Sequence, residues 1–216
     1  MVPALLTQPA ILCLVTDRNM VSRDRLADAV RKAVDGGVGM LQLREKDLPT
    51  DMLAAMALEL RLACEGRALL MINGDIDAAI ISDADGVHLP EAGPSVADVR
   101  KRLGGGKVIG RSVHSLESAV RSYEEGADYL IAGTIFETRS HPGKPPEGLA
   151  LLRSVAAAVH IPVLGIGGIN DRNANSVLEA GASGVAVISA ILAAADPEQA
   201  ARSLLDAMAG AGARRA

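Results

Sequence analysis

Two groups of residues in this sequence have the types and spacing needed to bind an anion. In the stretch QLREKD, Gln42 and Arg44 occupy alternate positions, with one residue between them, and Lys46 follows two residues later. Alternate residues of an extended strand face the same side, so Gln42 and Arg44 point together. Much later come the glycine-rich GIGG at 165–168 and a helical segment expected to begin near Ser189. Glycines allow close backbone approach and helix starts offer free N–H groups, so the second group predicts a phosphate site. The positive charges of Arg44 and Lys46 predict a further anion contact in the first group.

Each group also has a structural interpretation. Gly167 and Gly168 could serve only a tight turn, and Arg44 and Lys46 could form ion pairs with neighbouring acids. Two anion-binding patterns in one chain favour a ligand over these alternatives. The phosphate-binding residues predicted from the second group are Gly167, Gly168, Ile188 and Ser189.

The loop FETRSHPGKPPEG at 136–148 carries basic side chains among turn-forming prolines and glycines, and we expect it to cover the phosphate site. His114 and His141 are placed to face a ligand, and imidazole exchanges protons near neutral pH, so either could be a general base. His88 ends a strand and could be a packed core histidine, whereas His160 precedes a strand on the opposite rim. Neither a zinc-site spacing nor a hydrolase motif occurs in the sequence.

Short apolar runs alternate with segments of helical period, and these elements must position the candidate residues. ILCLVT precedes RDRLADAVRKAVDGG, and the pattern continues to IPVLGIGG with DRNANSVLEAG and GVAVIS with a final helix. Eight strand–helix units with strands apolar on both faces predict an α/β fold, the (β/α)8 TIM barrel. We expect a single domain over residues 1–216 with its core at about 10–209. In such a barrel the chemistry lies in the loops that follow the strands.

Composition excludes several classes of function. The 216 residues have a net charge of −4 and 1% aromatic residues, so no nucleic-acid partner is expected. The apolar runs are too short for a membrane span, and the N-terminal segment lacks the basic start of a signal peptide. Cys13 and Cys64 lie in apolar contexts that predict buried, reduced thiols. These features predict a soluble cytoplasmic protein, and a homo-oligomer is possible.

Read in order, the strand ends resemble the thiamine phosphate synthase and thiazole tautomerase superfamily over nearly the whole chain. The motifs that carry the resemblance are LVTDR, QLREKD, ING, ADGVHL, GRSVHSLE, GADYLIAGTIFET, GIGGI and GVAVISAI. The resemblance implies an enzyme of thiamine biosynthesis that binds a small phosphorylated thiazole at the barrel mouth. For the synthases it also implies a pyrimidine diphosphate, whose leaving diphosphate is stabilised by magnesium while the thiazole nitrogen captures a pyrimidine cation.

The resemblance assigns three sets of residues to the synthase substrates: contacts to the pyrimidine diphosphate, the thiazole-phosphate loop and the phosphate cradle. In that order they are Gln42, Arg44, Lys46 and Asn73; Thr138 and Ser140; and Gly168, Ile188 and Ser189. Ser112 and Thr134, at the ends of the fifth and sixth strands, complete the predicted substrate-binding set.

The metal positions depart from the synthase pattern. Gly74 and Gly93 stand where synthases have aspartate ligands, and glycine has no side-chain oxygen. Asp75 or Glu91 could replace them only by a shift, whereas magnesium demands near-octahedral oxygen ligation. His141 also stands where synthases have a lysine that contacts diphosphate. We therefore predict no metal site and no cofactor, with magnesium needed only if the chain is a synthase.

The motifs ING, HLPEAG and GRSVHSLE look more like the tautomerase branch. Its members move a proton and a double bond in a thiazole carboxylate phosphate, which requires an acid/base group but no metal. That branch has histidine where this chain has Thr134, so we predict His141 or His114 as the base. The main prediction is a thiazole tautomerase-like isomerase. The alternatives are a magnesium-dependent thiamine phosphate synthase and a non-catalytic phosphate-ligand regulatory protein.

Overall fold

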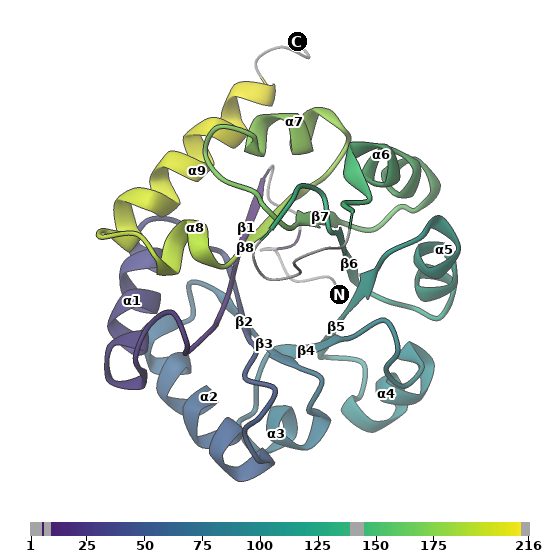
Figure 1. Cartoon of the computed structure of the whole chain (residues 1–216). Coiled ribbons are helices and arrows are strands. Elements are labelled where there is room, and N and C mark those ends of the chain that lie inside the picture. Colours follow the sequence, from purple (N-terminus) through teal and green to yellow (C-terminus); the bar gives the residue numbers. More distant parts are fainter. Residues whose placement is uncertain (1–5, 7–9, 139–144, 213–216) are drawn as a thin grey trace.

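Eight parallel strands form a closed barrel, which confirms the predicted fold. In this computed structural model, which describes residues 6, 10–138 and 145–212, each strand pairs with the next and β8 pairs with β1 (Figure 1). The strands are β1 (Ile11–Val15), β2 (Met40–Leu43), β3 (Leu69–Asn73), β4 (Gly86–Leu89), β5 (Val108–Val113), β6 (Tyr129–Gly133), β7 (Val163–Ile166) and β8 (Gly184–Val187).

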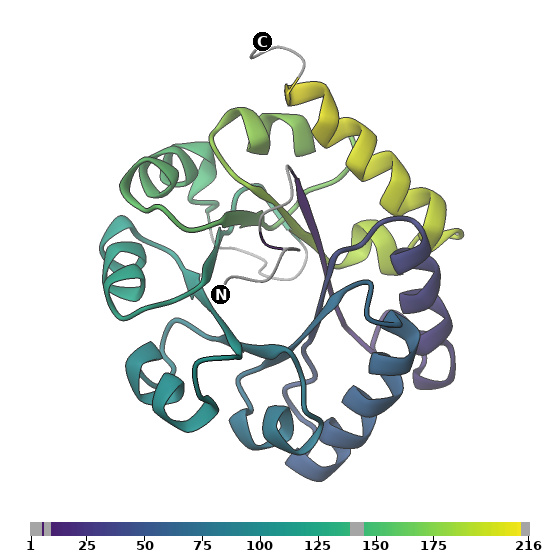
Figure 2. The same ribbon diagram turned by 180° about the vertical axis from the view of Figure 1, so that it is seen from behind.

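The helices surround the barrel as an outer ring, seen from both ends in Figures 1 and 2. They are α1 (Arg23–Asp35), α2 (Thr50–Cys64), α3 (Ile76–Ile81), α4 (Val96–Leu103), α5 (Leu116–Glu124), α6 (Gly148–Ala158), α7 (Ala174–Glu179), α8 (Ser189–Leu192) and α9 (Pro197–Gly212). The short α8 is an extra turn between β8 and α9. It begins where the sequence predicts a helix start.

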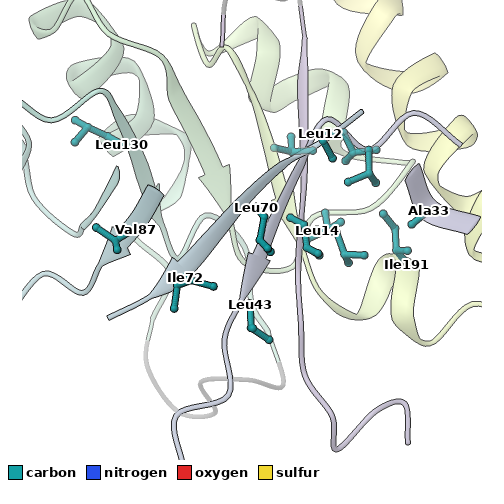
Figure 3. Packing of buried hydrophobic residues seen from close by; sticks show 14 of the residues in the cluster. Leu12, Leu14, Ala33, Leu43, Leu70, Ile72, Val87, Leu130 and Ile191 are labelled. Atoms are coloured by element: carbon teal, nitrogen blue, oxygen red, sulfur yellow. The ribbon is translucent and has the colours of Figure 1, made fainter. Parts of the chain in front are cut away.

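The strands are buried on both faces, because one face fills the barrel and the other meets the helices. In β1, Ile11 and Cys13 belong to the interior cluster, whereas Leu12 and Leu14 belong to the larger cluster between strands and helices. Figure 3 shows part of this larger cluster, which also includes Ile191 of α8. This alternation determines which residues point into the barrel, up to the strand ends that carry the candidate site.

Side-chain caps start α3 and α5 beside the carboxyl ends of β3 and β5. The Asp75 carboxylate accepts the Ala78 N–H at 2.8 Å at the start of α3. Ser115 precedes α5 and forms a capping box with Ser118. Because such caps satisfy N–H groups that lack helical acceptors, they fix the short loops after β3 and β5.

Both cysteines are buried and free, as the sequence predicts. Burial raises the pKa of the Cys13 and Cys64 thiols to about 12, so both are protonated at neutral pH. In the part of the chain that the structure describes, no helix has the length and apolar character needed to cross a membrane.

Candidate active site

A cavity of about 780 Å³ lies at the carboxyl ends of the strands. It brings together all the predicted site residues that fall within the described ranges. These are Gln42, Arg44, Lys46, Asn73, Ser112, His114, Thr134, Thr138, Gly167, Gly168, Ile188 and Ser189. Ser140 and His141 lie outside the described residues. The individual roles of these side chains stay predictions.

Arg44 and Lys46 place two positive charges in the cavity at the end of β2. The charge of Arg44 lowers the pKa of Lys46, and partial burial lowers it further. Neither side chain forms an ion pair with a carboxylate of the described residues, so the alternative of structural ion pairs finds no partner there. Two neighbouring cations that form no ion pair within the described part of the chain attract a polyanion such as diphosphate.

A buried polar pair that the sequence did not reveal anchors the loop carrying these cations. The Thr16 hydroxyl donates to Glu45 Oε1 at 2.8 Å and accepts the Arg44 backbone N–H at 2.9 Å. The Arg18 N–H also donates to Glu45, at 3.2 Å. Thr16 and Glu45 are both buried. Glu45 therefore fixes the loop after β2 instead of neutralising the cations.

Gln42 and Asn73 form a side-chain amide pair at the ends of β2 and β3. Gln42 Nε2 donates to Asn73 Oδ1 at 2.9 Å. Gln42 is 3% exposed, and its Oε1 is buried without a hydrogen-bond donor among the described residues. An unpaired buried acceptor is costly, and a ligand N–H in the cavity would satisfy it.

Glycines bring the backbone to a second part of the cavity, after β7. Gly167 and Gly168 have φ angles of 103° and 64°, in the region that L side chains avoid. A Cβ at Gly168 would lie 2.4 Å from the Glu137 carbonyl oxygen. Asn173 Nδ2 donates to the Gly168 carbonyl at 2.9 Å and so braces the turn. The two glycines are therefore required by the tight turn and by close packing against the loop after β6, and both also line the cavity.

The start of α8 completes this second part. Ile188, Ser189 and Ala190 line the cavity together with the two glycines. The N–H groups of the first turn of a helix have no helical acceptor and can bind an oxyanion. In the barrel β1 lies between β8 and β2, so this backbone group and the Arg44–Lys46 pair occupy separate parts of the rim.

The loop after β6 is closed at its base by hydrogen bonds. The Thr134 N–H donates to the Glu147 carboxylate, and the Glu147 N–H donates to the Thr134 carbonyl at 2.8 Å. Glu137 and Thr138, in the first part of this loop, line the cavity. The part of the loop at 139–144 lies outside the described residues.

His114, at the end of β5, is paired with Glu91 of the loop after β4. The Glu91 carboxylate accepts the His114 backbone N–H at 2.9 Å and lies 2.9 Å from His114 Nδ1. Burial alone would raise the pKa of Glu91, but hydrogen bonds from Ser118 and His114 outweigh it and lower the pKa. The pair therefore presents an imidazole backed by a carboxylate, an arrangement that can exchange a proton with a ligand.

The residues present do not fit the metal that the synthase resemblance implies. Gly74 and Gly93 offer no side-chain ligand, while Asp75 caps α3 and accepts the Thr50 hydroxyl at 2.8 Å. Glu91 is engaged with His114. Among the described residues, no group of three or more His, Cys, Asp or Glu could hold a metal ion. The prediction that the chain uses no cofactor stays a prediction.

His88 lies in the cavity wall and Tyr129 lies behind it in the barrel interior, and neither is among the site residues predicted from the sequence. His88 lines the cavity and is 1% exposed, with both ring nitrogens in hydrogen bonds to Tyr129 and Ser112. Burial lowers the pKa of His88 to about 3, and the charges of Arg111 and Arg44 contribute. The signal that could have found His88 is strand alternation, since it shares the inward face of β4 with Gly86.

A family model described as thiamine monophosphate synthase matches residues 12–191. The chain belongs to this family. It is an enzyme of thiamine biosynthesis, and the resemblance of its strand-end motifs is confirmed. The family match contains all the described cavity residues except Ala193.

Individual relatives give the same family. A thiamine-phosphate synthase of a Roseiflexus species is 43% identical over 196 residues, which cover 90% of this chain and 83% of the relative. One from Desulfitobacterium hafniense is 44% identical over 197 residues, covering 90% and 95%. The solved thiamine phosphate pyrophosphorylase from Pyrococcus furiosus has 35% identity and a TM-score of 0.84, covering 94% and 97%. The predicted closeness to the tautomerase branch has no specific support from these relatives.

Proposed function

We propose that this enzyme joins a pyrimidine diphosphate to a thiazole phosphate. The observation that carries the proposal is that one cavity contains two groups with the chemistry to bind anions, Arg44 with Lys46 and the backbone of Gly167, Gly168 and Ser189. An isomerase with one phosphorylated substrate needs one such group, whereas a condensation of two phosphorylated substrates needs two. The names of the relatives at 43–44% identity support the same reaction.

The amide pair suits the pyrimidine partner. Gln42 Oε1 needs a donor, and an amino group on the pyrimidine ring offers one. The bonded Asn73 side chain fixes the direction of the Gln42 amide. Gln42 and Arg44 share the inward face, so the ring and its diphosphate would lie along the end of β2.

The cations act on the leaving group. In the proposed reaction, the bond between the pyrimidine methylene carbon and the diphosphate oxygen breaks, and its electron pair leaves with the diphosphate. The lone pair of the thiazole nitrogen then forms the new carbon–nitrogen bond. Arg44 and Lys46 would stabilise the charge that develops on the diphosphate. Since the described residues do not fit a metal, no step is assigned to one.

The test is turnover with both substrates. Purified enzyme is mixed with pyrimidine diphosphate and thiazole phosphate, with and without magnesium, and thiamine phosphate and released diphosphate are measured by mass spectrometry. We expect one diphosphate released for each thiamine phosphate formed. Release of diphosphate without thiamine phosphate, or no consumption of either substrate, would contradict the proposal.

The His114–Glu91 pair, together with Gly74 and Gly93, favours a second candidate, the tautomerase. Its test is conversion of a thiazole carboxylate phosphate to its isomer, followed by NMR of the ring protons. The second candidate expects turnover that His114→Ala and Glu91→Gln each reduce, with His141→Ala testing the other predicted base. Binding without turnover in both assays would favour the non-catalytic phosphate-ligand protein.

A further inference from the structure

Three hydrogen-bonding side chains form a chain from the barrel interior to the cavity. The Tyr129 hydroxyl lies 3.1 Å from His88 Nδ1, and His88 Nε2 lies 2.8 Å from Ser112 Oγ. Tyr129 is fully buried and His88 is 1% exposed, whereas Ser112 is only half-buried and lines the cavity. The chain thus links a buried hydroxyl to the ligand-facing surface.

The strand register and one glycine explain why these side chains meet. His88 of β4 pairs in register with Gly110 of β5, which pairs with Tyr129 of β6. A Cβ at Gly110 would lie 2.1 Å from Cζ of Tyr129, so only a glycine lets the tyrosine ring cross β5 towards His88. Ser112 is two residues beyond Gly110 and therefore shares its inward face.

The direction of the hydrogen bonds follows from counting hydrogens. Among the described residues, the one acceptor for the Tyr129 hydroxyl is His88 Nδ1. If Nδ1 carried the ring proton, the fully buried tyrosine hydrogen would have no acceptor there, which is costly. Donation from Tyr129 to Nδ1 instead puts the ring proton on Nε2, which donates to Ser112 Oγ. The Tyr129 hydroxyl hydrogen and the His88 ring proton then each have an acceptor.

The ring of His88 is also neutral, as this order requires. Burial lowers its pKa to about 3, and the positive charges of Arg111 and Arg44 act in the same direction. Tyr129 keeps its hydrogen, because burial raises the pKa of its hydroxyl well above the ordinary value. At neutral pH the three side chains Tyr129, His88 and Ser112 therefore share one ring proton and two hydroxyl hydrogens.

We propose that Tyr129 is a positioning residue that fixes His88 as the Nε2–H tautomer, so that Ser112 presents its own hydrogen to the cavity. Ser112 then acts as a donor and selects a ligand atom that accepts a hydrogen bond, such as a ring nitrogen or a phosphate oxygen. The inference goes beyond the proposed function, because the order of hydrogens exists in the free protein and does not depend on the reaction.

The test is the tautomer of His88, read from ¹⁵N-histidine NMR of the free protein at neutral pH. The chain has 4 histidines, and loss of one signal set in His88→Asn assigns the ring. We expect the proton on Nε2. Tyr129→Phe, which removes one oxygen and keeps the packed ring, is expected to make the Nδ1–H form detectable. The matched variant Ser112→Ala removes the other partner and is expected to leave the proton on Nε2.

Two results would overturn the inference. A ring proton on Nδ1 in the unmodified protein would reverse the order of the chain, and this measurement needs no variant to fold. A tautomer that changes in Ser112→Ala but not in Tyr129→Phe would show that the serine, and not the tyrosine, fixes the ring. Thermal unfolding of both variants checks that the barrel is intact.

Discussion

Arg44 is the residue whose charge bears most directly on the proposed reaction. It lines the cavity without a carboxylate partner among the described residues. We expect Arg44→Ala to lower kcat/KM about 10- to 100-fold, the equivalent of a hydrogen bond to a charged group. Steady-state kinetics measure this effect. Arg31→Ala, which removes an arginine paired with Asp28 and Asp35 on the outer helix α1, is the control and should leave kcat/KM unchanged.

Single residues of the site could be predicted where strand alternation decides their direction. Alternation predicts that Gln42 and Arg44 share one face at the end of β2, whereas Asn73 is predicted from the family resemblance, and the cavity contains all three. The pairing of His88 with Tyr129 could not be predicted, because it depends on the register of three strands and on the space left by Gly110. A residue's partner across the barrel is set by packing that no local pattern reports.

At the scale of elements, the loop after β2 depends on the buried contact of Thr16 with Glu45. We expect Thr16→Val to remove this hydrogen bond. Among the described residues, the Arg44 N–H then has no acceptor and the Glu45 carboxylate keeps only the Arg18 N–H as a donor. The free energy of unfolding should fall by about 1–3 kcal/mol. The KM for the diphosphate substrate should rise, since the loop positions Arg44. Urea unfolding and kinetics measure the two effects, and an unchanged KM would separate the loop anchor from substrate binding.

The turn after β7 requires glycine at position 168. In Gly168→Ala the new Cβ would meet the Glu137 carbonyl, and the φ of 64° is itself unfavourable for alanine. We expect weaker binding of thiazole phosphate and a loss of stability of about 1 kcal/mol or more. Calorimetric titration and thermal unfolding measure these. Gly106→Ala, at a position with open space around it, is the matched control and should bind normally.

The elements themselves were well predicted, and the contacts between their loops were not. Short apolar runs and amphipathic segments predict the barrel, because strands buried on both faces require helices outside. The His114–Glu91 pair joins the loops after β5 and β4, and the Thr134–Glu147 bonds close the loop after β6. Such contacts depend on how neighbouring loops lie together, which the periodicity of the sequence does not describe.

For the whole molecule, the buried His88 makes stability depend on pH. Its folded pKa is about 3, whereas an exposed histidine of the unfolded chain titrates near ~6.5. Between these values the unfolded chain binds a proton that the folded chain does not. The stability contribution is therefore complete above pH ~6.5 and is lost progressively as pH falls towards 3.

We expect His88→Gln to reduce this dependence. Urea unfolding between pH 4 and 7 would give a shallower fall in the free energy of unfolding for His88→Gln than for the unmodified protein. His160→Gln, at an exposed position, is the control and should keep the original slope. Identical slopes for all three proteins would contradict the assignment of a buried neutral ring.

The outer surface carries one feature that bears on assembly. Of the described large hydrophobic side chains that are exposed, several lie on the neighbouring helices α2 and α3: Met52, Leu58, Leu62, Ile80 and Ile81. Single exposed apolar residues are common on monomers. That the protein forms a homo-oligomer stays a prediction from the sequence. The extent of the single domain over residues 1–216 also stays a prediction.

Simultaneous binding tests the central claim, that one cavity holds two separate anion-binding groups. Inorganic diphosphate is titrated calorimetrically into enzyme already saturated with thiazole phosphate. The account predicts that one diphosphate still binds per barrel, that Arg44→Ala weakens this binding about 10- to 100-fold, and that the same variant still binds thiazole phosphate. Competition between the two ligands for a single site would contradict it.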